Sequence, residues 1–434
     1  MKPKEWDTLF GTGYVINLTN EERRYFALDP VDPAWDTQSF HYESYKRYTR
    51  LTVFFSGSTI VKGIEEEIYR EENGFRFEES ITEYDTRLLT EDRQYILPLT
   101  ERGKPKKLTA TAVRGVAPFG CSFTVRMTRS DLRGERGGSL YLSNYRAEQT
   151  FPIGEREAAA RIDSDADFHA FARHYMETCP PDYFDRLAAF RQFRRVTVKY
   201  RPGDVFRMAY DRTHYCYGVI TGEVRQLRRM PEMPENSSFH HLMMVPIMVR
   251  LYGVVTERAD LTPEELQAYP LGRVIICGDN DIIWGTHPII GHRTLTAEDI
   301  EFPLITGRWR LRIPGLTRRT EKEDVPVEWG LCSTMIPWDS IPEELRQRLR
   351  DYETPHGGVM MGIPTEYALP DETCLGHCFF RDNLLNPHND DFRADILRLT
   401  GLPDGAGFDD FALRFGGLTR QEIADRIQNT SVRK

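Results

Sequence analysis

The chain has 434 residues, roughly three times the commonest domain size. We therefore expect two or three hydrophobic cores, each large enough to fold without disulfide bonds. Its 40% hydrophobic and 28% charged residues are ordinary globular values and exclude a chain that is disordered throughout. The formal net charge of -9 opposes binding to a nucleic-acid backbone, so we expect no nucleic-acid partner.

The first six residues carry two lysines and no apolar run follows them, so we expect no secretory signal and a cytoplasmic protein. The longest nearly unbroken apolar stretch, residues 242–249, contains Pro246 and is far shorter than the roughly 20 residues of a spanning helix. We therefore expect no membrane partner. The seven cysteines are an odd number without an export signal, which favours free thiols.

Residues 1–154 have the pattern of an antiparallel, strand-dominated domain. Apolar residues alternate or form short runs, as at residues 51–55, 95–97 and 123–125. Turn signals such as Asn73-Gly74 and Gly137-Gly138 separate these runs. Within the domain, residues 65–92 hold eleven acidic side chains against three arginines. This surplus favours the solvated surface of a β-hairpin over an acidic docking patch for a basic partner.

Residues 155–193 predict a helical-hairpin connector. Phe168, Phe171, Ala172 and Tyr175 recur at helical spacing, a second apolar set follows at residues 184–190, and a proline pair separates the two helices. A basic run comes directly afterwards and is more typical of an outer helix end and strand than of a nucleic-acid surface. Its members are Arg191, Arg194, Arg195, Lys199 and Arg201.

Residues 194–318 predict a central β-rich domain. Strand candidates lie at residues 196–198, 205–206, 215–220, 243–252, 274–278 and 282–284. One helix is expected where Thr262 can cap it and Pro263 occupies the first turn. Asp279-Asn280-Asp281 is expected as a tight turn between two strands, because the further acidic positions of a calcium loop are missing.

Residues 327–434 predict a mostly helical C-terminal region. Ser340 with Glu343 and Thr419 with Glu422 have capping-box spacing, and Gly401 follows the apolar pattern of residues 392–399 as a stop signal. The complete chain is therefore predicted to be α+β, with a strand-dominated N-terminal domain, a helical-hairpin connector, a central β-rich domain and a helical C-terminal region.

Candidate chemistry is sparse, and we assign no catalytic residue, no cofactor and no metal. Cys374, His377, Cys378 and His388 are suitable zinc ligands, but their spacing is not that of a paired-knuckle site. His240 and His241 are neighbours, and on a strand they would point to opposite faces. These two residues and His287 keep a metal-dependent phosphoester hydrolase open as an alternative.

The central domain contains a recognisable set of motifs. Lys-Tyr-Arg-Pro-Gly-Asp-Val-Phe at residues 199–206 is followed by Tyr-Gly-Val-Ile at 217–220, Gly-Asp-Asn-Asp-Ile-Ile-Trp-Gly at 278–285 and Ile-Ile-Gly at 289–291. Over about residues 195–304 the chain resembles the bacterial immunity protein family numbered twenty-six, which belongs to polymorphic toxin systems. The resemblance implies a small strand-dominated α+β domain in a cytosolic protein that binds and neutralises a toxin.

The resemblance suggests an interface rather than a catalytic centre. We predict that the cognate toxin contacts a rigid surface near Asp204, Tyr217, Asp279, Asp281 and Trp284, where aromatic anchors give affinity and charges give steering. The plain alternative is that Asp204 is a turn residue and Trp284 a core anchor. Some family members carry a phosphotriesterase label, which sustains the hydrolase alternative. A scaffold with several partners is a third possibility, and the sequence leaves the oligomeric state open.

Overall fold

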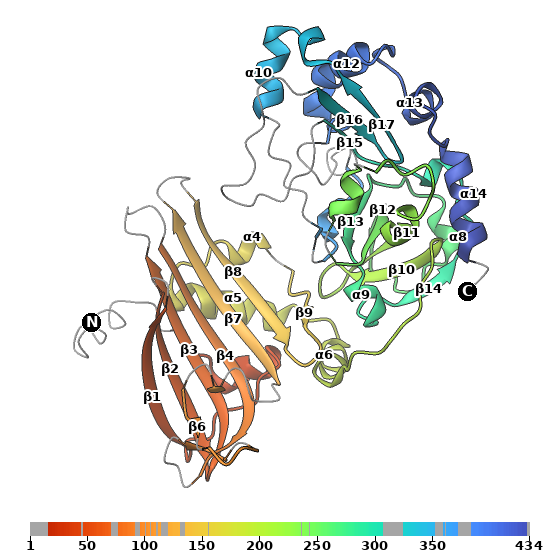
Figure 1. Cartoon of the computed structure of the whole chain (residues 1–434). Helices are drawn as coiled ribbons and strands as arrows, with labels where there is room; N and C mark the ends of the chain where they lie inside the picture. The colour runs from red at the N-terminus through yellow and green to blue at the C-terminus, as the bar shows by residue number, and fades with distance from the viewer. Residues whose placement is uncertain are drawn as a thin grey trace. The chain divides into compact units, whose positions relative to one another are not determined.

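The computed structural model confirms the predicted α+β class and divides the chain into two compact units (Figure 1). It describes residues 16–44, 47–70, 77–91, 96–99, 101–104, 106–109, 112–113, 120–130, 135–154, 156–235, 237–242, 244–306, 324–351, 359–360, 362–371 and 383–431. Unit 1 consists of Met1–Arg194 with Asp211–Thr213, and unit 2 consists of Arg195–Tyr210 with His214–Lys434. The boundary after Arg194 falls inside the basic run.

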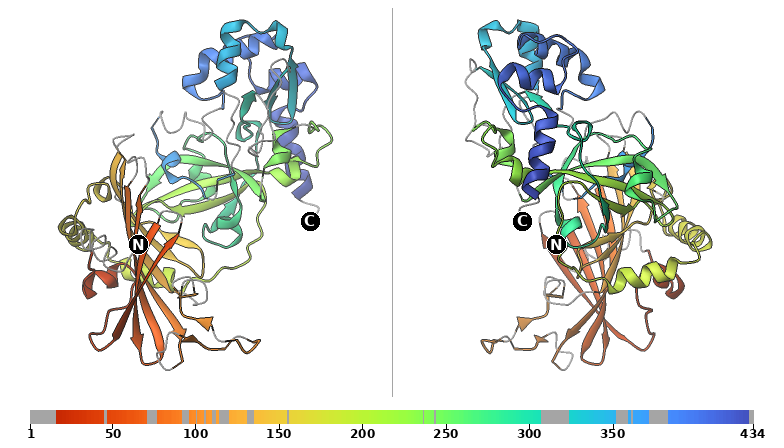
Figure 2. Two further views of the ribbon diagram at one scale, coloured as in Figure 1. Left: turned by 60° about the vertical axis from the view of Figure 1, so that its left-hand side comes forward. Right: turned by 90° about the vertical axis from the view of Figure 1, so that its right-hand side faces the viewer.

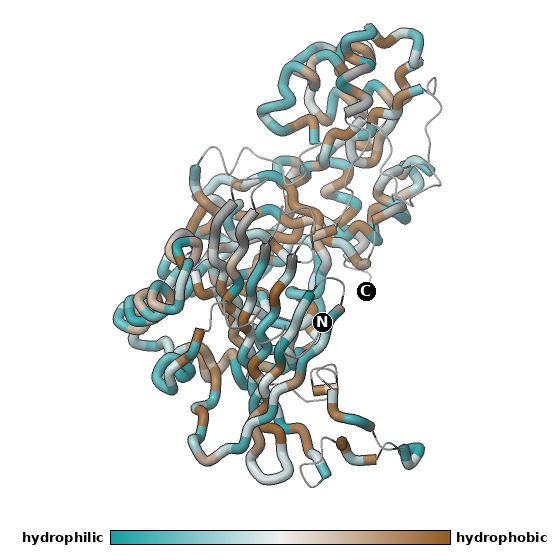
Figure 3. The backbone as a smooth tube through the Cα atoms, turned by 90° about the vertical axis from the view of Figure 1, so that its left-hand side faces the viewer, coloured by the Kyte–Doolittle hydropathy of each residue, from teal (hydrophilic) through white to brown (hydrophobic). Residues whose placement is uncertain are grey.

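Unit 1 is built on a seven-stranded antiparallel sheet with the order β1-β2-β3-β4-β7-β8-β9 (Figure 2). The strands are β1 (Asp36–Ser44), β2 (Arg47–Ser56), β3 (Thr59–Arg70), β4 (Phe77–Leu89), β7 (Cys121–Ser130), β8 (Glu135–Asn144) and β9 (Gln149–Phe151). The short pair β5 (Ile96–Leu97) and β6 (Lys106–Lys107) lies in the connection from β4 to β7. Hydrophobic and hydrophilic residues alternate along the long strands, so each face of the sheet has its own lining (Figure 3).

Helices cover one face of this sheet. They are α2 (Asn20–Tyr25), α4 (Arg156–Ala159), α5 (Asp165–Glu177) and α6 (Tyr183–Gln192). The two predicted helices are thus confirmed as α5 and α6, and the predicted apolar stripe of α5 is buried against Phe123, Val125 and Leu142 of the sheet. The predicted connector segment therefore contributes to the core of unit 1.

The other face of the sheet carries a second core. Leu51 and Val53 of β2 and Tyr84 of β4 pack there with Leu97 and Val113 from the connection between β4 and β7. The sheet therefore has a hydrophobic core on each of its two faces.

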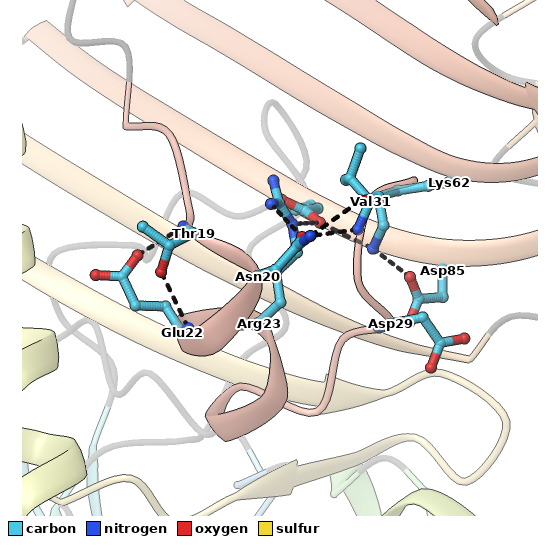
Figure 4. A network of polar contacts seen from close by, with 9 residues as sticks. Thr19, Asn20, Glu22, Arg23, Asp29, Val31, Lys62 and Asp85 are labelled. Atoms are coloured by element: carbon cyan, nitrogen blue, oxygen red, sulfur yellow. Dashed lines mark hydrogen bonds and ion pairs between the residues drawn. The ribbon is translucent and has the colours of Figure 1, made fainter. Parts of the chain in front are cut away.

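The acidic segment forms a β-hairpin, as expected, but the prediction that its carboxylates are solvated was wrong for the five that are buried, which are Glu65, Glu78, Glu79, Glu83 and Asp85. Glu83 and Asp85 of β4 are buried on the helical face and both contact the ammonium group of the buried Lys62. Arg23 of α2 donates to both carboxylate oxygens of Glu83, at 2.7 and 3.0 Å. Figure 4 shows the neighbourhood of this network at α2, Lys62 and Asp85. Lys62 and Arg23, which lie outside the acidic segment, thus neutralise two of its carboxylates.

Arg212 belongs to unit 1 although it follows the boundary in sequence. Its Nη1 donates to the carbonyl of Tyr175 at 2.8 Å, and its guanidinium carbon lies 3.9 Å from the centre of the Tyr175 ring. Arg212 is buried, so this short excursion of the chain is part of the packing of unit 1.

Unit 2 contains a five-stranded antiparallel sheet with the order β13-β12-β11-β10-β14. Its strands are β10 (Asp204–Ala209), β11 (Tyr215–Glu223), β12 (Pro246–Thr256), β13 (Ile275–Gly278) and β14 (Ile289–His292). The short helices around it are α7 (Val224–Leu227), η1 (Ser238–His241), α8 (Pro263–Leu266), α9 (Asn280–Ile283) and η2 (Ala297–Asp299). The predicted cap at Thr262 is confirmed, because its hydroxyl accepts the Glu265 N–H in a capping box.

Two predicted strands of the central module are wrong. Residues 282–284 lie in and after α9, where the Asp279 carbonyl accepts the N–H groups of Ile282 and Ile283. An apolar run of three residues is too short to distinguish a strand from a helical turn. Residues 196–198 are extended but join no sheet, and their N–H groups bond to carbonyls at the end of α9 instead.

The C-terminal region is mostly helical, as predicted, but two strands that the sequence did not indicate, β16 (Val325–Trp329) and β17 (Cys332–Ile336), form a small sheet with β15 (Leu304–Thr306) at the end of the central module. The strands pair in the order β15-β16-β17. The helices are η3 (Trp338–Ser340), α10 (Glu343–Asp351), η4 (Thr365–Ala368), η5 (Pro387–Asn389), α12 (Asp390–Leu399), α13 (Phe408–Phe415) and α14 (Arg420–Ser431).

The expected caps of this region have mixed outcomes. The capping box of Thr419 with Glu422 is present, and Gly401 follows α12 with a positive φ of 79°. Among the described contacts Ser340 forms no such box, because α10 begins at Glu343 and Ser340 does not directly precede it; its hydroxyl donates to the carbonyl of Pro337. Among the described helices, none is long and apolar enough to cross a membrane.

Candidate binding surface of the central module

Three of the five predicted site residues lie together around α9, and the other two lie elsewhere. Asp279, Asp281 and Trp284 are at the start, in the first turn and at the end of this helix. Asp204 begins β10, and Tyr217 is in the middle of β11. The five side chains do not form one continuous group.

Asp204 anchors a turn. Its carboxylate accepts the Arg201 N–H at 2.9 Å and contacts Nδ1 of His292 at 2.8 Å. The preceding Gly203 has a φ of 95°, a conformation that glycine adopts without a side-chain clash. Asp204 is buried, so its contacts within the module account for its presence.

Tyr217 is a core residue. Its side chain is fully buried, and its hydroxyl donates to the carbonyl of Arg258 at 2.6 Å. Burial raises the pKa of Tyr217, so the phenol stays neutral and hydrogen-bonded. A partner protein cannot reach this ring without opening the core.

Asp279 holds the start of α9. It is buried, and its carboxylate accepts a hydrogen bond from the Tyr200 hydroxyl at 2.8 Å. Burial and this carboxylate together raise the pKa of Tyr200 far above its usual range. The pair therefore ties the extended segment before β10 to the loop that starts α9.

Asp281 lies beside the partly buried imidazole of His287. The Asp281 carbonyl accepts the His287 N–H at 3.0 Å, and Oδ2 of Asp281 lies 3.8 Å from Nε2 of His287. The His287 ring stacks on Phe206, with the ring centres 6.2 Å apart. Burial lowers the pKa of His287, although the nearby Asp281 opposes this shift. His287 is therefore neutral near pH 7.

Trp284 is at the end of α9, and its ring contacts Arg195. The sequence did not indicate Arg195 as a site residue. The guanidinium carbon of Arg195 lies 3.7 Å from the centre of an indole ring that is partly exposed. The Trp284 carbonyl accepts the N–H of Val196 at 3.2 Å, which fixes the segment that carries Arg195. The only advance signal for this arginine was its place in the basic run.

Exposed apolar side chains flank α9 at both ends. Val196 is 53% exposed and packs so closely on Gly285 that an added Cβ would lie 2.6 Å from Val196 Cγ2. At the other end, Met244 and Val245 are 42% and 45% exposed, and the Met244 side chain lies against Gly278. Met244 has a φ of 65°, a strained value for a residue with a side chain.

We call this set the α9 surface and define it by residues from three segments of unit 2. Its members are Arg195, Val196, Met244, Val245, Asp281 and Trp284. Met244 and Val245 were not predictable as site residues, because their apolar run looked like the start of a buried strand. That strand, β12, begins only at Pro246.

Among the described side chains, His240 and His287 belong to no cluster of metal-ligating residues. Within the described ranges, no group of three His, Cys, Asp or Glu side chains is arranged to hold a metal ion. His240 is exposed in η1, so the assumption that it lies on a strand was wrong. The side chain of His241 and residues Cys374, His377 and Cys378 lie outside the described residues, whereas His388 is in η5.

Comparison with known proteins bears on the central module alone. No curated protein and no solved structure shows significant similarity to the chain. Residues 201–310 match the model of the family described as Immunity protein 26, which confirms that the central module resembles this family.

Proposed function

We propose that the chain is a cytoplasmic immunity protein whose α9 surface binds a toxin protein and thereby neutralises it. The match over residues 201–310 supports an immunity role, and the exposed apolar side chains around α9 support this location of the interface. Exposed apolar side chains and aromatic rings are typical of protein-binding sites.

The composition of the α9 surface suits a protein partner. Tryptophan, arginine and methionine are enriched at interfaces, and this surface contains one of each. Arg195 already lies on the Trp284 ring, so the pair is ordered before the partner arrives and little side-chain entropy remains to be lost. Asp281 adds a negative charge at the edge, which favours a cationic group on the toxin.

The strain at Met244 also supports the proposal. A left-handed conformation at a non-glycine residue persists only where the surrounding structure enforces it, and such residues cluster at functional sites. Here the strained backbone holds a flexible apolar side chain against Gly278, next to the start of α9. Met side chains adapt to irregular partner surfaces.

The test is growth of cells that express the chain with the toxin encoded by the neighbouring gene. We expect the unmodified chain to restore growth and to form a complex on a sizing column. Val245→Asp should abolish rescue, because it places a charge next to Met244 in the apolar part of the α9 surface. Trp284→Ala should weaken binding at least tenfold, in line with the loss of a hot-spot aromatic residue.

Met335→Asp is the matched control. Met335 is 47% exposed in β17, comparable with Val245, but it lies outside the α9 surface and outside the segment that matches the family. This variant should rescue growth as well as the unmodified chain does. If Val245→Asp and Met335→Asp, both confirmed as folded by circular dichroism, rescue equally, the α9 surface is not the interface.

A further inference from the structure

A buried carboxylate of the C-terminal region lies against the loop that leads to the α9 surface. Glu328 of β16 is 4% exposed, and among the described residues no lysine or arginine pairs with it. Burial raises the pKa of Glu328, and hydrogen bonds to its oxygens oppose this shift. Because a buried carboxylate is unfavourable unless hydrogen bonds replace its lost hydration, these bonds identify what the residue holds in place.

Both carboxylate oxygens of Glu328 hold the start of η1. The Ser238 N–H donates to Oε1 at 3.1 Å and to Oε2 at 2.9 Å, and the Ser237 hydroxyl also donates to Oε1. The Ser237 oxygen in turn accepts the Phe239 N–H at 3.2 Å. Ser237 and Ser238 are themselves buried. The first residues of η1 are therefore fixed by one carboxylate that lies 90 positions beyond Ser238 in the sequence.

Arg228, at the end of α7, holds the other end of η1. Its Nε donates to the Phe239 carbonyl at 2.7 Å, and its Nη2 donates to the Leu242 carbonyl at 2.5 Å. The next fixed point is Pro246, where β12 begins to pair with β13. Residues 243–245 therefore connect two anchored positions of the chain.

This short connection accounts for the strained backbone of Met244. A span between two fixed points permits few conformations, and Met244 adopts the left-handed one, with a φ of 65°. Its side chain lies against Gly278, whose N–H donates to the carbonyl of Met360 in the C-terminal region at 2.8 Å. The adjacent Val245 is 45% exposed. The positions of both side chains in the α9 surface therefore depend on the contacts that anchor η1.

We propose that Glu328 is a positioning residue for toxin binding, because by fixing η1 it sets where Met244 and Val245 meet the toxin. This inference rests on the immunity function proposed above. Glu328 lies outside residues 201–310, the segment that matches the family. The C-terminal region thus shapes a binding surface whose side chains belong to the central module.

The first test is hydrogen exchange of the full chain without toxin, followed by mass spectrometry. Glu328→Met removes both acceptor oxygens and keeps an unbranched side chain. We expect the amides of residues 237–245 to exchange about fivefold faster or more, while those of β10 and β11 exchange at an unchanged rate. Ser237→Ala removes one of the same hydrogen bonds from the loop side and should accelerate exchange in the same residues.

The second test is the affinity of the purified variants for the toxin encoded by the neighbouring gene. Glu328→Met should raise the Kd about tenfold or more, and Ser237→Ala should raise it in the same direction. Asp299→Asn is the matched control. Asp299 is also a carboxylate of unit 2 with 4% exposure, but it holds η2, where it accepts the Thr296 N–H at 2.7 Å. This variant should lose stability and bind the toxin as the unmodified chain does.

A double-variant cycle separates positioning from a general loss of stability. In a chain that carries Met244→Ala and Val245→Ala, Glu328→Met should change the Kd less than about threefold, because the side chains that it positions are gone. In a Trp284→Ala chain it should change the Kd as much as in the unmodified chain. Trp284 lies at the end of α9, where Arg195 contacts its ring, and does not depend on η1.

Two results would overturn this inference while the proposed immunity function stands. One is unchanged exchange of residues 237–245 in both Glu328→Met and Ser237→Ala. The other is a toxin Kd that Glu328→Met leaves unchanged or raises equally in both backgrounds. If circular dichroism shows that Glu328→Met is unfolded, Ser237→Ala decides the same comparisons. If the unmodified chain forms no complex with the toxin, the proposed function fails and this inference fails with it.

Discussion

Lys62 has no exposed surface, and its ammonium group lies between the carboxylates of Glu83 and Asp85. We expect Lys62→Met to destabilise the protein by about 3–5 kcal/mol, because it leaves the buried Asp85 carboxylate without its cation and Glu83 with Arg23 alone. Denaturant unfolding monitored by circular dichroism measures this loss. Lys62→Met combined with Asp85→Asn should recover part of it, and a double variant no more stable than the single one would contradict this account.

The difference in the free energy of unfolding between Lys62→Met and the unmodified protein should be smaller at low pH. Burial raises the pKa of Asp85, and Lys62 opposes that shift. A carboxyl group whose folded pKa is raised costs stability as the pH rises through the interval from its ordinary value of 3.8 to the raised one. Removal of Lys62 raises the folded pKa of Asp85 further. Lowering the pH should therefore increase the free energy of unfolding of the variant, relative to that of the unmodified protein.

His287 should make stability depend on pH in the opposite sense. Burial lowers its folded pKa below the ordinary value of 6.5, so the folded state favours the neutral ring. Stability is then lost as the pH falls below 6.5, where the unfolded chain takes up the proton more readily. Urea midpoints at pH 7.5 and 5.5 should differ less in His287→Gln than in the unmodified protein. An equal difference in both proteins would show that another group is responsible.

At the scale of elements, the sequence predicted best where several local signals agreed. Helix α5 was identified from a full apolar stripe, and α8 from Thr262, Pro263 and the following acidic residues. Helix α9 was missed, because its four residues contain no complete period and Asp279 resembles a turn residue. The α9 surface was therefore only partly predictable, since Met244 and Arg195 reach α9 through tertiary contacts.

The turn before β10 gives a prediction for one element junction. Gly203 has a positive φ, donates to the Ile220 carbonyl at 2.7 Å and accepts the Arg293 N–H at 2.9 Å. An added Cβ would lie 2.4 Å from the Arg293 carbonyl oxygen. Gly203→Ala should therefore lower the free energy of unfolding by about 1–3 kcal/mol or more. Gly405→Ala is the control, because no atom lies within 4 Å of a Cβ there and its stability should change little.

At the scale of the whole molecule, the regions predicted from the sequence join into larger cores. Phe302 and Leu304 of the central module share one hydrophobic cluster with Trp329 and Phe408 of the C-terminal region. The Trp329 indole donates to the Phe302 carbonyl at 3.1 Å. The sequence could not reveal this joint core, because its strands and helices lie far apart along the chain.

This shared core predicts which fragment can fold. Residues 195–434 should give a cooperative thermal transition, whereas residues 195–304 should not, because the shorter fragment exposes the apolar surface that β16 and α13 cover. Circular dichroism melts of the two purified fragments test this. A cooperative transition in residues 195–304 would show that the central module is stable without the C-terminal region.

The excursion of Asp211–Thr213 into unit 1 has a consequence for how such genes can recombine. Exchanging residues 195–434 for an unrelated sequence would also remove Arg212, and Tyr175 would lose both its hydrogen bond and its stacked guanidinium. A crossover that keeps unit 1 intact must therefore carry a compatible β10–β11 turn with it. Residues 211–213 must therefore be inherited together with unit 1, although they lie within the sequence of unit 2. We expect natural chimaeras to preserve an arginine at this turn.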